Sequence, residues 1–444
     1  MIAKLEKDWH QYPVFKIDFN GVNFTEKGNL EATIEYYLAN WEKIYGETPR
    51  EVPMGKRFEQ ILSLAYQQTG RRAVVLVDEY DKPILDALDT PLEDANREIL
   101  KAFYSTFKGA DEYLRFVLLT GVTKFSQVSV FSGFNQPKDI SMDNHYEALC
   151  GVTQVELEHY FAEPIANLAE KFNYTVEEMK DVLKMQYDGY HFGSGLLGVY
   201  NPFSLLTAMA KGKIGSYWFG SGTPTYLIEM LNKFHVKPQQ IGGRKVLAES
   251  FDAPTERMTD INPLLYQSGY VTIKNQDSFT GLYTLDIPNK EVRIGLMKSL
   301  LSGYLNQYTA EGFTTVALLF KAITEERIDD ALRLLQTFLS TIPQCDNTDY
   351  EGHYQSLLYT IFSLLGMYVD VEVRTPDGRV DMVMRTPSIL YVIELKLNKT
   401  ADIAMQQIDL KNYPERFALC GLPIVKVAIN FDSKRHTLED WIIS

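Results

Sequence analysis

The chain has 444 residues, of which 45% are hydrophobic, and its formal net charge is −14 at pH 7. This length fits roughly two to four domains with sizeable apolar cores. The acidic balance argues against a protein that coats nucleic acid without regard to sequence, but a nuclease can keep a local basic groove in an acidic chain.

The number and spacing of the cysteines indicate a protein of a reducing compartment. The three cysteines, Cys150, Cys345 and Cys420, are far apart in sequence and have no metal-ligand spacing. We therefore expect reduced, buried thiols in a cytoplasmic protein. No run approaches the roughly eighteen apolar residues that a membrane span needs, and the first residues show no signal-peptide pattern.

The first predicted elements alternate between strand and helix. Tyr12–Phe19 predicts a core strand, and residues 28–45 and 55–69 predict amphipathic helices. Ala73–Val77 is an unbroken apolar run, which predicts a parallel strand covered on both faces. The order of these elements is typical of an α/β domain with a parallel sheet.

Two acids follow that apolar strand. Asp78 and Glu79 would lie at the carboxyl edge of the sheet, where the Asp of a nucleotide-hydrolysing site binds Mg²⁺ and the Glu polarises water. The next predicted strand, Leu114–Thr120, would bring the hydroxyl of Thr120 to the same edge as a sensor of the γ-phosphate. An alternative remains open, because Asp78 or Asp81 would also serve as the N-cap of a helix that begins near Pro83.

The middle of the chain is predominantly helical. Residues 151–172 predict helices with a capping box at Thr153 and Glu156, and residues 176–185 and 202–235 continue in helices. The loop of residues 187–192 (YDGYHF) is either a ligand platform of aromatics and His191 or, as we favour, a packed loop at a domain junction. Residues 251–288 predict a short helix and a hairpin in a winged-helix-like arrangement.

The last hundred residues carry the clearest chemical pattern. Gly378–Leu397 predicts a β-hairpin in which Glu394 and Lys396 point to one face, and register would bring Asp381 opposite them. Two carboxylates and an ammonium in this arrangement suit metal-assisted hydrolysis. The plainer alternative for Glu-x-Lys is a solvated face or a cross-strand ion pair, but Val392, Ile393 and their neighbours make this a strand of the buried type.

Elements on both sides of the hairpin complete the pattern. Glu351 opens a predicted helix that ends at Gly366, and the stretch AMQQIDLKNY carries Gln407, Lys411 and Tyr413 on another. Helix, strand, strand and helix in this order, with these residues, resemble the PD-(D/E)xK nuclease fold. The closest likeness is to the version found at the carboxyl end of bacterial AAA-ATPase-like proteins, which are common in gut anaerobes.

The same family resemblance extends over the rest of the chain. The segments that carry it are VDEYDKP (77–83), LLTGVTKFSQVSVFSGFNQPKDIS (118–141), YDGYHF (187–192), YNPFSLL (200–206), FGSGTPTYLI (219–228) and IPNKEVR (287–293). The resemblance implies an α/β protein with a truncated P-loop NTPase-like core at residues 1–150. A helical lid and winged-helix-like linker would occupy 151–345, and a restriction-endonuclease-like domain 346–444.

For the site, the resemblance implies that Asp381 and Glu394 bind Mg²⁺, that Lys396 is catalytic, and that Glu351 and Gln407 support them. It also implies Walker B and sensor roles for Asp78, Glu79 and Thr120. One departure is that Arg379 and Val380 precede Asp381, where the family pattern has a proline. That departure lowers the specificity of the motif.

These residues predict Mg²⁺-dependent hydrolysis of DNA by the carboxyl-terminal domain, in which water activated near Lys396 attacks in line. An alternative is a non-catalytic, ATPase-derived scaffold that regulates or binds nucleic acid or protein, and a third is a protein-interaction module in which both acidic clusters are structural. The expected partner is DNA, a membrane is not expected, and a homo-oligomer stays open.

No GxxxxGK[ST] motif occurs in the 444 residues, and the pairs Gly55-Lys56 and Gly212-Lys213 lack its other residues. In the family this loop precedes the strand that starts here at Tyr12, so the chain reads as if it began after the Walker A segment. Full-length relatives would bind ATP and Mg²⁺ through the backbone amides and lysine of that loop.

We therefore predict that this polypeptide binds ATP poorly or not at all, because Asp78 and Glu79 have no phosphate-binding loop to work with. Calorimetric titration with ATP and Mg²⁺ measures this directly. Tight binding would contradict the prediction.

Overall fold

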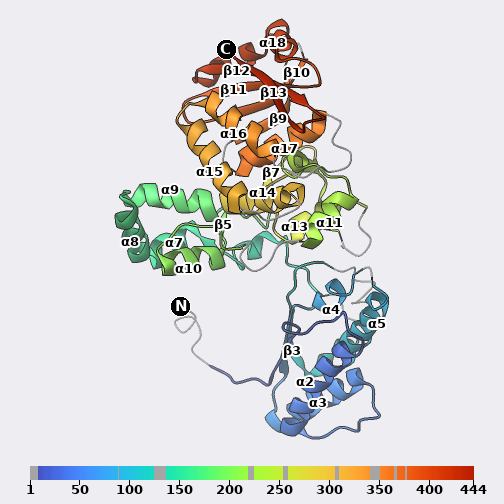
Figure 1. Ribbon diagram of the computed structural model, residues 1–444. Helices are drawn as coiled ribbons and strands as arrows, with labels where there is room; N and C mark the ends of the chain where they lie inside the picture. Colours follow the sequence, from blue (N-terminus) through green and yellow to red (C-terminus); the bar gives the residue numbers. More distant parts are fainter. Residues whose placement is uncertain are drawn as a thin grey trace. The chain divides into compact units, whose positions relative to one another are not determined.

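The computed structural model describes residues 9–88, 90–124, 137–218, 225–253, 259–305, 310–340, 351–364, 368–375 and 378–444. The chain divides into two compact units. One consists of Met1–Ile140 with Ala248–Ser268, and the other of Ser141–Leu247 with Gly269–Ser444. Figure 1 shows the chain coloured along its sequence.

The first unit contains a parallel sheet in the order β1-β2-β3. Its strands are β1 (Val14–Asp18), β2 (Ala73–Asp78) and β3 (Leu114–Leu119). Its helices of ten or more residues are α2 (Asn29–Tyr45), α3 (Met54–Thr69) and α5 (Glu93–Tyr104), and its shorter ones are α4 (Lys82–Leu85), α6 (Thr106–Gly109), α12 (Ala248–Phe251) and α13 (Asn262–Gln267). The predicted parallel α/β core is confirmed.

One face of this sheet packs on the helices. Phe15 and Val75 lie in a cluster with Leu38 of α2 and Phe58 of α3, and all four side chains are buried. On β2, burial alternates with half-burial along the strand, so the predicted cover of both faces is wrong for the residues that the structure describes. The apolar run of β2 alone could not reveal this, because half-buried positions of a sheet also accept valine and leucine.

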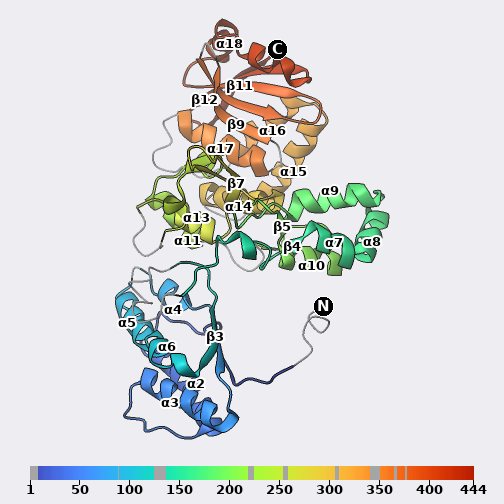
Figure 2. The same ribbon diagram turned by 180° about the vertical axis from the view of Figure 1, so that it is seen from behind.

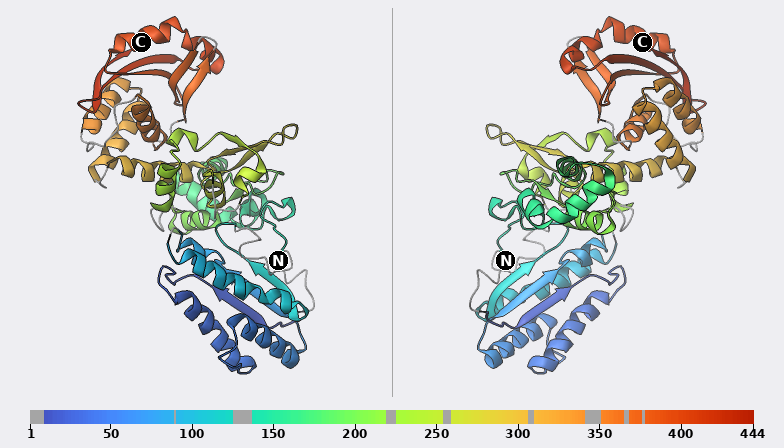
Figure 3. Two further views of the ribbon diagram at one scale, coloured as in Figure 1. Left: turned by 90° about the vertical axis from the view of Figure 1, so that its right-hand side faces the viewer. Right: turned by 90° about the vertical axis from the view of Figure 1, so that its left-hand side faces the viewer.

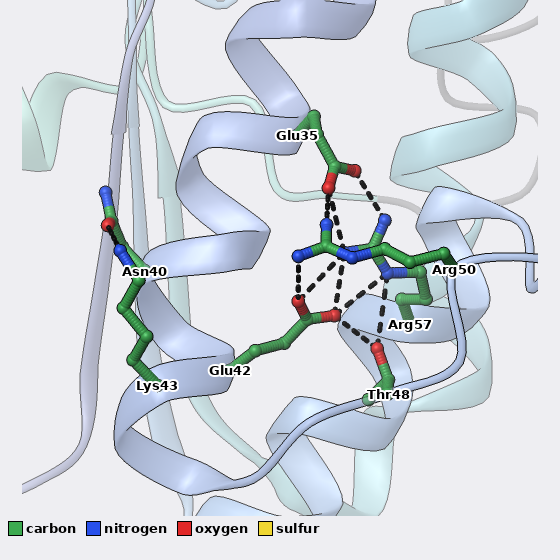
Figure 4. A network of polar contacts seen from close by, with 7 residues as sticks. All are labelled: Glu35, Asn40, Glu42, Lys43, Thr48, Arg50 and Arg57. Atoms are coloured by element: carbon green, nitrogen blue, oxygen red, sulfur yellow. Dashed lines mark hydrogen bonds and ion pairs between the residues drawn. The ribbon is translucent and has the colours of Figure 1, made fainter.

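Helices α2 and α3 are joined by a buried ion network (Figure 4). Arg57 is 2% exposed and donates to both carboxylate oxygens of Glu42, at 2.7 and 2.9 Å. The Thr48 hydroxyl donates to Glu42 and lies 3.2 Å from Nε of Arg57, and Glu35 pairs with Arg57 on its more exposed side. Glu42 itself is 3% exposed, so these hydrogen bonds offset the cost of burying its carboxylate.

The part of the second unit that precedes α17 (Glu351–Leu364) is mainly helical. Its helices are α7 (Gln154–Tyr160), α8 (Ala162–Phe172), α9 (Val176–Tyr187), α10 (Pro202–Lys211), α11 (Thr225–Lys233), α14 (Lys290–Leu305), α15 (Ala310–Thr324) and α16 (Ile328–Ser340). The short strands β4 (Val152–Thr153) and β5 (Val199–Tyr200) pair with each other, and β6 (Arg244–Val246), β7 (Thr272–Gln276) and β8 (Tyr283–Asp286) form an antiparallel sheet in the order β6-β8-β7. The predicted capping box at Thr153 and Glu156 is present.

The carboxyl-terminal part of this unit is a mixed sheet in the order β13-β12-β11-β10-β9 (Figure 2). Its elements are α17 (Glu351–Leu364), β9 (Tyr368–Thr375), β10 (Gly378–Arg385), β11 (Leu390–Leu397), α18 (Ala401–Leu410), a 3₁₀ segment η6 (Tyr413–Cys420), β12 (Ile424–Asp432) and β13 (Thr437–Ile443). Strands β10 and β11 are antiparallel, as the predicted hairpin requires, whereas β11 and β12 are parallel.

Helices α17 and α18 pack on the two faces of this sheet, and α16 packs on β13 at its edge (Figure 3). Ala404 and Ile408 of α18 share a core with Val392 and Ala428. Tyr354 of α17 stacks on Phe431, whose ring centroid is 4.4 Å away. Since Ala428 and Phe431 are three residues apart on β12, their side chains lie on opposite faces, and so do the two helices.

The expected burial of the cysteines is wrong where the structure describes them. Cys150 is exposed, Cys420 is half-buried, and both are free thiols. They lie at the end of a turn and at the end of η6, where a small polarisable side chain costs little on the surface. Cys345, and the predicted boundary at residues 345–346, lie outside the described residues.

We expect Arg57→Ala to lower the free energy of unfolding of the first unit by about 3 kcal/mol, because it leaves the buried carboxylate of Glu42 without its main partner. Native-state hydrogen exchange of the amides of α2 and α3 measures this locally. Lys56→Ala is the matched control, because Lys56 is 66% exposed and its ion pair with Glu59 lies at the surface. Equal protection in both variants would contradict the prediction.

Candidate functional site

The hairpin of β10 and β11 brings the predicted carboxylates together. The strand register pairs Met382 with Ile393, so the next positions outward are Asp381 and Glu394. Oδ2 of Asp381 accepts a hydrogen bond of 2.8 Å from the backbone N–H of Leu395. Asp381 is thereby fixed against the neighbouring strand, beside Glu394.

Lys396 lies between the two acids. Its Nζ is 2.8 Å from Oε1 of Glu394 and 4.0 Å from Oδ2 of Asp381. It also donates to the carbonyl oxygen of Leu395 at 2.8 Å. The side chain of Glu394 is fully buried, that of Lys396 is 8% exposed and that of Asp381 17%, so water reaches the site mainly from the side of Asp381.

Burial, together with the neighbouring charge of Asp381, raises the pKa of Glu394 to about 7, although Lys396 opposes the shift. Burial also raises the pKa of Asp381, against the N–H of Leu395 and the ammonium of Lys396. Two acids that resist ionisation side by side are typical of a site made to receive a cation.

The donor set fits a divalent metal ion such as Mg²⁺. Oε2 of Glu394 is buried and has no hydrogen-bond partner among the described residues. Within those residues no group of three His, Cys, Asp or Glu side chains gathers at metal-binding distance. Two carboxylates suffice for Mg²⁺, which keeps several of its waters and is commonly bound by one or two carboxylates together with substrate phosphate.

The structure describes the side chain of only one of the two predicted supporting residues, Gln407 and Glu351. Gln407 is half-buried on α18, and its Nε2 donates to the hydroxyl of Tyr413 at 3.2 Å. That hydroxyl donates to the carbonyl oxygen of Arg379 at 2.8 Å, so Gln407 is linked to β10 two residues before Asp381. Glu351 begins α17, and its side chain lies outside the described part of the structure.

Sequence reasoning missed one residue of the site and misplaced two others. Gln355, one turn after Glu351 on α17, donates from Nε2 to the carbonyl oxygen of Asp381 at 2.8 Å. Its helical spacing from Glu351 was the signal that pointed to it. Helix α18 ends at Leu410, so Lys411 and Tyr413 lie beyond it and not on the helix as predicted.

The second acidic cluster lies at the carboxyl edge of the parallel sheet. The hydroxyl of Thr120 donates to Oδ1 of Asp78 at 2.8 Å, as expected for the ends of neighbouring parallel strands. Glu79 has a φ of 56°, in the left-handed region. Its pKa is raised by burial, and also by the charges of Asp81 and Asp78.

Asp81 is a structural residue of this edge. It is fully buried, and the side chain makes no cap hydrogen bond to α4, although the sequence suggested an N-cap there. Its Oδ1 accepts from the N–H of Val122, and its Oδ2 accepts from the N–H and hydroxyl of Thr123. Asp81 therefore ties the turn after β2 to the segment that leaves β3.

The YDGYHF loop is packed against the hairpin of β7 and β8. The Thr272 hydroxyl accepts from the N–H of His191 and donates to its carbonyl oxygen, at 2.8 and 3.0 Å. Nζ of Lys274 donates to the carbonyl oxygens of Gly189 and Pro288. These backbone contacts support the packed-loop interpretation.

The fold and this geometry define a class: a parallel-sheet α/β unit of the ATPase type, and a carboxyl-terminal domain of the nuclease type with its carboxylates and lysine on one hairpin. Two family models match the chain, a predicted AAA-ATPase at residues 1–131 and the PD-(D/E)XK nuclease superfamily at residues 349–441. The uncharacterized protein in the vnfD 5' region of Azotobacter chroococcum mcd 1 is 32% identical over 455 residues, which cover 98% of this chain and 84% of that protein. The chain belongs to the AAA-ATPase-like family that carries a PD-(D/E)XK nuclease-superfamily domain.

A helix that crosses a bilayer must be both long and apolar. In the part of the chain that the structure describes, none of the helices meets both conditions.

We expect Asp81→Ala to destabilise the first unit by about 3 kcal/mol, since two buried donors of Thr123 and the part-buried N–H of Val122 lose their acceptor. Hydrogen exchange at the amides of Val122 and Thr123 reports the loss. Asp111→Ala, which removes an exposed carboxylate of the same unit, is the control and should leave this exchange unchanged. Unchanged exchange in Asp81→Ala as well would contradict the role given to Asp81.

Proposed function

We propose that the carboxyl-terminal domain hydrolyses phosphodiester bonds of DNA with the help of Mg²⁺. The observation that carries this proposal is that Asp381 and Glu394 lie side by side on one hairpin, where Oε2 of Glu394 is buried and has no hydrogen-bond partner among the described residues. The match to the nuclease superfamily, whose members generally use Mg²⁺, supports it.

Asp381 and Glu394 would hold the metal ion. Bound there, Mg²⁺ would lower the pKa of water and neutralise charge on the scissile phosphate. The N–H of Leu395 occupies Oδ2 of Asp381, which leaves Oδ1 for the ion. The unpartnered Oε2 of Glu394 is the second ligand atom.

Lys396 supplies a positive charge beside the two carboxylates. A fixed ammonium beside the two carboxylates can orient the attacking water or stabilise negative charge that develops on the phosphate. Gln355 and the chain from Gln407 through Tyr413 act at a distance, because they hold the backbone of β10 at Asp381 and Arg379. We assign them positioning roles, and we propose the same for Glu351.

The alternative is a non-catalytic domain that binds nucleic acid or protein. One observation favours it: Nζ of Lys396 is engaged by Glu394 and by the carbonyl oxygen of Leu395. A lysine committed to such contacts would serve to neutralise a buried acid and would not reach a substrate. Under this alternative, Asp78, Glu79 and Thr120 are remnants of a nucleotide site with a structural role.

Incubation of the chain with supercoiled, linear and single-stranded DNA, in Mg²⁺, Mn²⁺ or EDTA, separates the two functions. We expect metal-dependent cleavage that Asp381→Ala and Lys396→Ala each lower by about 10²–10³-fold, as is usual when one group that stabilises the transition state is removed. EDTA should abolish it.

The matched controls are Asp402→Ala and Lys434→Ala, which remove exposed groups of the same charges from the same domain. They should cleave like the unaltered chain. Folded protein that cleaves none of these DNAs would overturn the nuclease proposal in favour of the binding domain.

A further inference from the structure

Basic side chains flank the start of β10, next to the candidate site. Arg379 is 57% exposed and lies two residues before Asp381 on β10. Its charge is close enough to oppose the rise in the pKa of Asp381. Lys411 is exposed, and its Cδ is 3.4 Å from the position that a Cβ on Gly378 would take.

The backbone beneath these two residues is fixed. Tyr413 is 1% exposed, and its hydroxyl donates to the carbonyl oxygen of Arg379 while accepting from Gln407. Segment η6 therefore lies against the start of β10. This contact holds the backbone of Arg379 against Tyr413, two residues after Lys411.

A third cation lies on the adjoining strand. Arg374 of β9 is exposed and stands directly opposite Arg379 in the register. Like charges directly opposite each other on a sheet destabilise it. In a chain with a net charge of −14, this juxtaposition of two arginines is best explained by an anion that they bind in common.

A carboxylate on β9 competes with such an anion for Arg379. Oε2 of Glu372 is 3.4 Å from Nη1 of Arg379, and both side chains are about half exposed. Glu372 has a φ of 53°, which is rare for a residue other than glycine and turns its side chain from the regular strand direction. An exposed pair of this kind is weak, so a phosphate can replace Glu372.

We propose that Arg374, Arg379 and Lys411 bind the sugar-phosphate backbone of a nucleic acid beside the phosphate that lies at Asp381 and Glu394. Glu372 occupies Arg379 when no nucleic acid is bound. This inference rests on the proposed function for the place of the reacting phosphate. Two residues along a strand advance by about 7 Å, so Arg379 is in position for the phosphate next to the reacting one.

Fluorescence anisotropy with a labelled 30-base-pair duplex, and with the single strand alone, tests binding without cleavage when EDTA is present. We expect Arg379→Ala and Lys411→Ala each to weaken binding about tenfold. The slope of log Kd against log salt concentration should fall by about 0.9 for each duplex phosphate that is no longer neutralised. Glu372→Gln should bind more tightly than the unaltered chain, with an unchanged slope.

Arg385→Ala is the control, because Arg385 is exposed at the opposite end of the same strand. It should bind like the unaltered chain. Unaltered affinity and slope in the Arg379→Ala, Lys411→Ala double variant would overturn the inference, and so would an unaltered chain that binds neither probe.

The outcomes separate this inference from the nuclease proposal. Weakened binding in the double variant supports the inference even where the unaltered chain cleaves no DNA, and then only the nuclease proposal fails. Metal-dependent cleavage with a double variant that binds normally leaves the nuclease standing and removes the inference. Asp381→Ala should lose cleavage and keep binding, because it retains all three cations.

Discussion

The burial of charge on β11 is the constraint on which the carboxyl-terminal domain depends. The residues of this strand that precede Glu394, and the one between it and Lys396, are apolar or aromatic, and the strand is buried from Leu390 to Lys396. An isolated carboxylate or ammonium in such a place would cost several kcal/mol. The two groups tolerate it because they stand two residues apart on one face, 2.8 Å from each other. Asp381 adds a second acid beside them, and a single lysine cannot neutralise both acids when both are ionised.

The hairpin differs from the acidic cluster at the carboxyl edge of the parallel sheet in how far its carboxylate oxygens are hydrogen-bonded. Both oxygens of Asp81 accept hydrogen bonds from Val122 and Thr123, so the protein itself engages each of them. Glu394 has a buried oxygen without a partner among the described residues. Burial is similar for the two side chains, so exposure alone does not identify a functional acid. What differs is the acceptor capacity that the surrounding backbone leaves unused.

The sequence predicted the features that follow from local periodicity. Alternation along β11 places Glu394 and Lys396 together, the turn residues place Asp381 on the preceding strand, and the apolar runs of β1, β2 and β3 predict a parallel sheet. It could not predict features that arise from contacts between distant elements. Gln355 reaches Asp381 from another helix, and Tyr413 binds Arg379 across 34 positions of the chain. The exposure of Cys150 and the half-burial of alternate residues on β2 depend in the same way on what packs nearby.

The charged groups around Asp381 are arranged from buried to exposed. The innermost pair, Glu394 and Lys396, is buried and compensates itself in part. Asp381, at the mouth, is 17% exposed and is oriented by a backbone N–H. Arg379 and Lys411 lie outside it and are largely solvated, so each is strongly hydrated and screened when the site is empty. Negative charge thus gathers where a metal ion would be desolvated, and positive charge where a polyanion would first arrive. A single polymeric ligand with phosphates at regular intervals, accompanied by a divalent ion, complements both layers at once, whereas a free metal ion or a small anion satisfies only one of them.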